Sequence, residues 1–139
     1  MQSGATNQER KLIVWGTLFV LGHYAVVVWH ITLLVKVQPA FPAIAVLMLL
    51  LGNLIPVAGL VVFAKNLPRV AGTMILVPLG TALVIGGYTH FLTPGSDNVF
   101  RMPSGGLTLP FQVSAIVLAL LEALGCWVSI RMFLFMPDR

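Results

Sequence analysis

The stretch Leu21–Leu34, LGHYAVVVWHITLL, places two histidines, His23 and His30, inside a long apolar run. In an α-helix, residues seven apart return to nearly the same side, so both imidazole rings lie on one face, about 10 Å apart along the axis. No aspartate, glutamate, lysine or arginine interrupts residues 12–35. A run of this kind is long enough to cross a lipid bilayer as a helix, which takes roughly 20 apolar residues.

The same pattern recurs along the whole chain of 139 residues. Hydrophobic residues make up 58% of it, charged residues only 9%, and its mean hydropathy is +0.98, whereas about a quarter of the residues of a soluble domain are charged. Glu122 is the only acidic residue inside the apolar runs. The sequence therefore predicts an all-α integral membrane protein, a bundle of four transmembrane helices in one domain, 1–139. The predicted helices are 12–35, 41–64, 70–92 and 109–133, and Pro56 and Pro78 are expected to kink the second and third of them.

The basic residues predict the orientation of the bundle. Six of the eight lie at the two termini and in the second loop, and only Lys36 and Arg101 lie at the other ends of the helices. Lysine and arginine accumulate on the cytoplasmic side, so both termini are expected in the cytoplasm. The long connection 93–108, rich in proline and glycine, is then expected to form a cap on the outer face.

The formal charge of +4 is explained by this orientation signal and by attraction to anionic lipid headgroups. No basic stripe with interleaved aromatic residues is present, so a nucleic-acid partner is not expected. The bilayer itself is the first expected partner. The compact loops and the clear charge bias are typical of a bacterial inner membrane protein.

One polar residue falls near the middle of each predicted helix: His23, Asn53, Thr81 and Glu122. An ionised carboxylate in the bilayer core is costly, so Glu122 is expected to face the bundle interior and to be protonated or paired. His23 is the titratable partner expected at that depth. We therefore predict a buried His23–Glu122 contact with Asn53 and Thr81 nearby and Tyr88 above them.

This polar layer has two interpretations. Interhelical hydrogen bonds can fix the packing of membrane helices without any ligand. Alternatively, the same residues form a binding or proton-relay site, in which His23 exchanges a proton with Glu122, and Asn53, Thr81 and Tyr88 position a polar head group.

A second set of candidates lies nearer the outer end of the bundle. His30 and His90 are expected at similar depth on different helices, where they could hold a haem iron or join Asp97 around a metal ion. On a regular helix, Tyr88 and His90 point in nearly opposite directions. If Tyr88 faces inward, His90 faces the lipid.

The loops are too small to form a soluble catalytic domain. The favoured function is therefore a non-catalytic one: a small multi-pass subunit or a self-associating membrane component, in a homo-oligomer or a larger membrane complex. The alternative is a protein that binds a lipophilic ligand or redox cofactor, such as a quinone or haem, or that moves protons or small solutes through the His/Glu site. The sequence identifies no particular cofactor, and enzymatic activity stays open.

Overall fold

The computed structural model describes residues 7–95, 97–102 and 104–135, and in them the chain is helical apart from short connections. Four segments are long and apolar enough to cross a membrane, which confirms the predicted all-α, membrane-spanning fold class. The helices are α1 (Asn7–Val37), α2 (Ala43–Gly52), α3 (Leu54–Ala64), α4 (Pro68–Gly87), the π-helix η1 (Tyr88–Leu92) and α5 (Thr108–Phe135).

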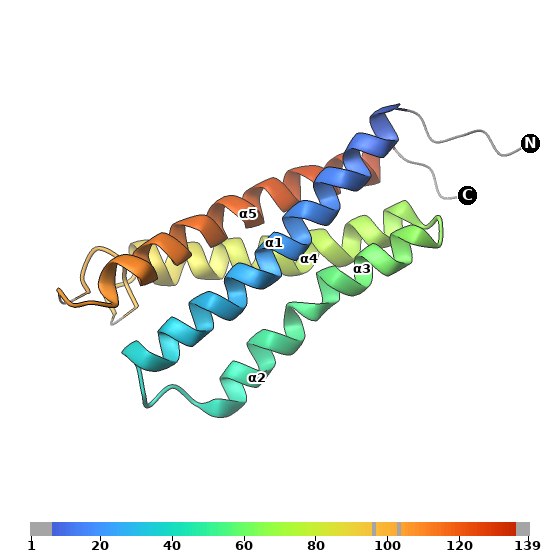
Figure 1. Cartoon of the computed structure of the whole chain (residues 1–139). Coiled ribbons are helices and arrows are strands. Elements are labelled where there is room, and N and C mark those ends of the chain that lie inside the picture. The colour runs from blue at the N-terminus through green and yellow to red at the C-terminus, as the bar shows by residue number, and fades with distance from the viewer. Residues whose placement is uncertain (1–6, 96, 103, 136–139) are drawn as a thin grey trace, which may run out of the picture.

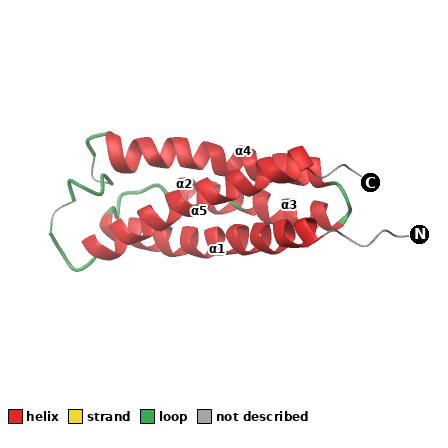
Figure 2. Ribbon diagram, turned by 90° about the horizontal axis from the view of Figure 1, so that it is seen from above, coloured by secondary structure: helices red, strands yellow, loops and turns green. Residues whose placement is uncertain are grey.

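The helices run roughly side by side in an elongated bundle, with the connections at its two ends (Figures 1 and 2). The beginning of α1, the α3–α4 turn and the end of α5 lie at one end. The α1–α2 loop and the connection from η1 to α5 lie at the other. Successive spans therefore alternate in direction, and α1 and α5 are antiparallel.

The second predicted helix, 41–64, is not one helix. The regular helix is interrupted at Asn53, so that α2 ends at Gly52 and α3 begins at Leu54, although the N–H of Asn53 still donates to the carbonyl of Leu49. Pro56 explains the position of this break, because it has no N–H to donate to the carbonyl of Gly52 and its ring would crowd that carbonyl in a continuous helix. In the observed arrangement Pro56 lies in the first turn of α3, where a helix tolerates proline.

The other boundaries differ less from the prediction. The first helix extends beyond 12–35 in both directions, and the last one beyond 109–133. The third begins at Pro68 and widens into a π-helix over its last five residues. Before it, Asn66 takes a left-handed conformation with φ 61°, which asparagine tolerates well, and closes the tight α3–α4 turn.

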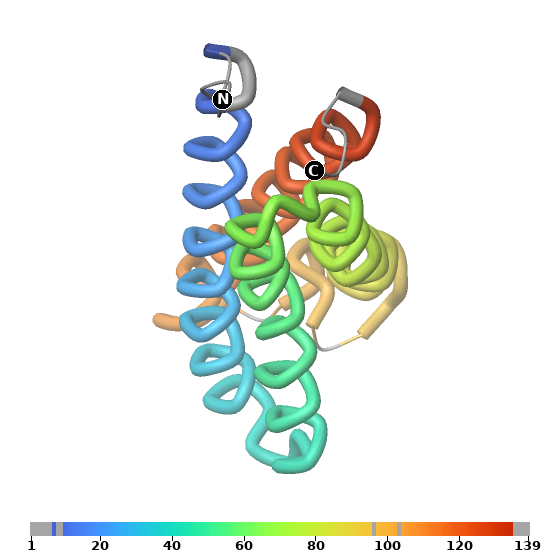
Figure 3. Tube along the Cα trace, turned by 90° about the vertical axis from the view of Figure 1, so that its right-hand side faces the viewer, coloured from blue at the N-terminus to red at the C-terminus, as the bar shows by residue number. Residues whose placement is uncertain are grey.

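Most packing follows the order α1–α5–α4–α3, and the seam between α1 and the α2–α3 pair is the least extensive. Glycine brings α4 and α5 together: a Cβ on Gly72 would lie 3.1 Å from the carbonyl oxygen of Ser129. Such close approach of backbones is typical of membrane helices. By contrast, α2 contains no buried residue and lies away from α4 and α5 in Figure 3.

Candidate functional site

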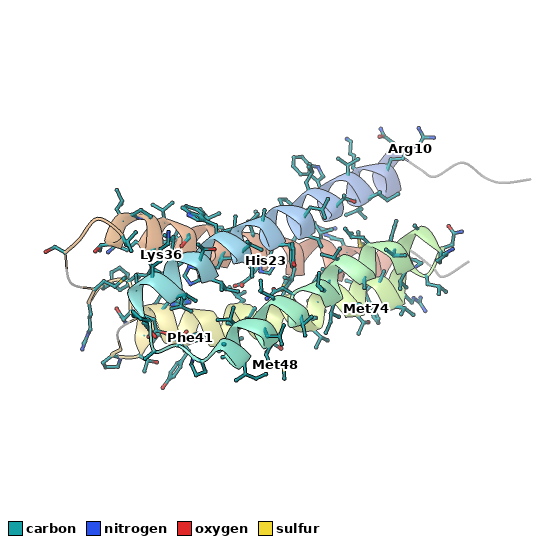
Figure 4. All side chains as sticks on the ribbon, turned by 60° about the horizontal axis from the view of Figure 1, so that its bottom comes forward. Arg10, His23, Lys36, Phe41, Met48 and Met74 are labelled. Carbon is teal, nitrogen blue, oxygen red and sulfur yellow. The ribbon has the colours of Figure 1, made fainter. Side chains whose placement is uncertain are left out.

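The midplane of the bundle holds one buried pair of titratable side chains, His23 on α1 and Glu122 on α5. The His23 Nε2 and the Glu122 Oε1 are 3.3 Å apart, and the two residues are 1% and 6% exposed. Figure 4 labels His23 midway along α1, between Arg10 and Lys36 near its two ends. The predicted interhelical contact is therefore formed.

The pair accommodates a carboxyl group in the membrane without a net charge. With one proton between them, the two side chains form either a neutral imidazole with a carboxylic acid or an imidazolium with a carboxylate, and the total charge is zero in both cases. This removes the penalty that a lone carboxylate would meet in the bilayer core. The Nδ1 of His23 is buried and has no hydrogen-bond partner among the described residues.

The other three residues predicted for this layer lie elsewhere. Asn53 donates through Nδ2 to the carbonyl of Leu49, at 2.7 Å, within its own helical segment. Thr81 is exposed on the outer side of α4, in a shallow depression, and Tyr88 is 59% exposed. Within the described part of the chain, no hydrogen bond links any of them to the His23–Glu122 pair. The structure thus brings together two of the five candidates.

A second polar cluster surrounds His30, which lies seven residues after His23 on the same face of α1. The Nδ1 of His30 lies 2.8 Å from the hydroxyl of Ser114 on α5, and that hydroxyl donates to the carbonyl of Phe111, also at 2.8 Å. His30 is 5% exposed. Its Nε2 is buried without a hydrogen-bond partner in the described ranges.

His90 reaches the same cluster from η1. Its ring lies 4.9 Å from that of His30, centroid to centroid, at 76°. Its Nδ1 donates to the backbone carbonyl of Asp97 at 3.0 Å, and its own carbonyl accepts the N–H of Val99 at 2.9 Å. The two histidines are therefore neighbours. His90 points into the bundle and Tyr88 points away from it. Tyr88 is therefore not positioned above the His23–Glu122 pair, as a ligand site that includes Tyr88 would require.

Asp97 contributes its carbonyl to His90. No group of three or more histidine, cysteine, aspartate or glutamate side chains able to hold a metal is found among the described residues. A haem clamped between His30 and His90 does not fit either. With metal–nitrogen bonds of about 2 Å on opposite sides of a macrocycle, the ring centroids would be about 6 Å apart, against the 4.9 Å observed.

Ser114 is the residue whose role sequence reasoning missed. It lies eight residues before Glu122 on α5, while His30 lies seven residues after His23 on α1. Because α1 and α5 are antiparallel, a contact between His23 and Glu122 brings His30 and Ser114 to the same level. The matching spacing was a signal that predicts the second pair once the first is known.

The fold and the polar clusters together define a four-span, all-helical membrane protein with histidine-centred contacts between its helices. The chain matches no family model, no curated protein and no solved structure. The functional argument therefore rests on its own residues.

Proposed function

We propose that this chain is a small, non-catalytic membrane protein that self-associates through α2 and α3. The observation that carries the proposal is the helix break at Gly52–Asn53, in the middle of a membrane span and on a poorly covered side of the bundle. We further propose a bacterial inner membrane location with both termini in the cytoplasm, on the strength of the short loops and the charge bias.

The α2–α3 span is the least covered of the four. In its most apolar window 11% of the residues are buried inside the chain, against 39% for the windows in α1 and α5. Side chains such as Met48 and Ile44 are more than half exposed. Apolar exposure alone suits lipid as well as protein, so the polar groups of this span decide between the two.

The break leaves polar groups that lipid cannot satisfy. The backbone N–H and the side-chain Nδ2 of Asn53 both donate to the carbonyl of Leu49. The carbonyl of Gly52 has no helical donor, because Pro56 has no N–H. The Oδ1 of Asn53 has no hydrogen-bond partner within the described residues. Irregular backbone at membrane depth is tolerated where protein or a water-filled cavity covers it.

A second copy of the chain supplies the matching groups. A residue that lies next to the two-fold axis of a symmetric dimer contacts the same residue of the second copy. A side-chain amide can make such a contact because it is both a donor and an acceptor. Two Asn53 side chains can therefore bond each other in a symmetric dimer. Gly52 beside it has nothing within 4 Å of the position a Cβ would occupy, so a partner helix can approach closely there.

The test is the dimerisation equilibrium in liposomes, measured by energy transfer between donor- and acceptor-labelled chains as the protein is diluted in lipid. Two symmetric intramembrane hydrogen bonds are worth about 1–2 kcal/mol together. We therefore expect Asn53→Leu to weaken association by about 5- to 30-fold.

The matched control is Thr81→Leu, which removes an exposed polar side chain from the outer side of α4. It should leave energy transfer unchanged. A wild-type chain that stays monomeric at every protein-to-lipid ratio contradicts the proposal, as does a dimer that survives Asn53→Leu.

A further inference from the structure

We infer that the strap, residues 93–95 and 97–102 of the connection between η1 and α5, is released from the bundle at acid pH, and that protonation of His90 releases it. The inference is independent of self-association through α2 and α3. It rests on the contacts that hold the strap, on the place of His90 among them and on the groups that surround the His90 ring.

Val99 holds the strap against the bundle. Its side chain is 2% exposed, and its N–H donates to the carbonyl of His90 at 2.9 Å. Its own carbonyl accepts a hydrogen bond from the Nε2 of Gln112 at 2.6 Å. The strap is therefore docked by one buried apolar side chain and two backbone groups. The buried residues of the apolar cluster that receives Val99 are Leu33, Leu34, Phe111 and Ala115.

His90 holds the strap at a second point. Its Nδ1 donates to the carbonyl of Asp97 at 3.0 Å, and because a carbonyl only accepts, this nitrogen carries a proton. His90 is thus tied to the strap both through its ring and through its own carbonyl. In the neutral ring that single proton is already used, and the Nε2 carries none. The docked strap therefore needs only a neutral imidazole at residue 90.

The ring of His90 lies among other rings. Its centroid is 4.9 Å from that of His30 on α1 and 5.8 Å from that of Phe111 on α5. Within the described residues no ion pair joins His30 or His90 to a carboxylate. A charge on His90 would therefore stand against a second imidazole and an apolar ring. The other titratable or charged groups at this end of the bundle are Lys36, Asp97 and Arg101.

Protonation of His90 therefore favours the released strap. An imidazolium buried without a counter-charge is costly, and a second charge on His30 would repel it. Once the strap is released, water reaches the His90 ring, and an imidazole in water takes up a proton at about pH 6.5. Because the ring is neutral in the docked form and free to charge in the released form, docking is stable above that pH and weakens below it.

The experiment measures how fast a maleimide labels Val99→Cys in a Cys126→Ala background, in the full-length chain purified in detergent. Each rate is divided by that of Phe100→Cys, a position that is 77% exposed in the docked form, so that the pH dependence of thiol reactivity cancels. Between about pH 7.5 and about pH 5 this ratio should rise by about 10- to 30-fold. The upper value is the limit for one histidine that protonates only in the released strap.

His90→Asn separates the titration from the hydrogen bond. Its amide nitrogen takes the place of the ring Nδ1, so it keeps a donor for the carbonyl of Asp97 and cannot take up a proton. The same change of pH should then alter the ratio by less than about threefold. Gln112→Leu is the matched control, because it removes a hydrogen bond to the strap that does not titrate. It should raise labelling of residue 99 at both pH values and keep the pH dependence.

Circular dichroism and gel filtration at both pH values report whether the bundle stays folded. A ratio that does not change with pH in the chain that retains His90 overturns the inference, as does an equal rise in His90→Asn. A rise that comes with loss of helix also overturns it, because the whole bundle and not the strap alone would then open. If His90→Asn does not fold, His90→Gln, which has a longer amide side chain, takes its place.

Discussion

At the scale of single residues, Glu122 and His23 form the most predictable contact in the molecule. An acid within an apolar span needs a partner, and His23 was the titratable side chain expected at the same depth. Their 3.3 Å contact follows from that requirement. The same reasoning did not locate Thr81 or Tyr88, whose side chains are exposed.

Thr81 and Tyr88 were misplaced because hydropathy does not identify the inner face of a membrane helix. Such a helix is apolar all round, because lipid and the protein interior are both apolar. The inward side of α4 is given instead by Ala71, Gly72, Ile75 and Leu79, which differ little in polarity from the outward side. The π-helical turn at η1, which sets the direction of His90, had no recognisable sequence pattern.

Truncation of Glu122 tests the contribution of the pair to stability. Glu122→Ala leaves both ring nitrogens of His23 buried without a partner, which should lower the free energy of unfolding by about 1–3 kcal/mol. Glu122→Gln keeps a hydrogen-bonding group at the same place and should cost less than about 1 kcal/mol. Equilibrium unfolding in mixed micelles measures both, and equal losses would contradict a hydrogen-bonded role.

Gly72 offers a second test at this scale. Alanine is normally favoured over glycine in a helix by about 0.5–1 kcal/mol. At Gly72, however, the added Cβ would press on the backbone of Ser129, and we expect a net destabilisation of about 1–3 kcal/mol. Gly87→Ala, which has nothing within 4 Å, is the matched control and should be neutral or stabilising in the same unfolding assay.

At the scale of helices, the four apolar runs fixed the number of spans and most of their boundaries, because length and continuity are direct consequences of bilayer thickness. The break between α2 and α3 was predicted only as a kink near Pro56. A missing N–H weakens a helix near a proline, and at the interruption the side-chain Nδ2 of Asn53 joins its backbone N–H as a second donor to the carbonyl of Leu49.

Replacement of Pro56 should join the two helices. In Pro56→Ala the N–H of residue 56 becomes available to the carbonyl of Gly52, and we expect a continuous helix through residues 52–54. Carbon chemical shifts from nuclear magnetic resonance in micelles report this directly. Pro78→Ala is the control, because α4 already continues through Pro78 and its helical range should not change. Unaltered shifts at residues 52–54 in Pro56→Ala would show that proline does not cause the break.

At the scale of the whole molecule, charge is separated along the bundle axis. Arg10, Lys11, Lys65, Arg69 and Arg131 belong to the end that carries the beginning of α1, the α3–α4 turn and the end of α5. Lys36 and Arg101 lie at the opposite end, and Arg139, also used for the prediction, lies outside the described residues. This separation is what the positive-inside rule requires of an oriented membrane protein.

Orientation is tested by single cysteines in a Cys126→Ala background. Asn66→Cys lies in the α3–α4 turn and Ser104→Cys in the connection before α5, both exposed. In intact cells a membrane-impermeant maleimide should label residue 104 and should reach residue 66 only after the membrane is opened. Labelling of residue 66 in intact cells would reverse the proposed orientation.

The spacing of the two polar clusters along α1 has one more consequence. His23 and His30 are separated by about 10 Å along α1, and between them Val27 packs against Leu118 of α5 in a cluster that also includes Ile31. A proton moves between groups that are in hydrogen-bond contact. The apolar stretch therefore interrupts a hydrogen-bonded path from the outer end of the bundle to Glu122. We therefore expect the chain not to conduct protons along this face: liposomes that contain it should hold a voltage and a pH gradient as long as empty ones.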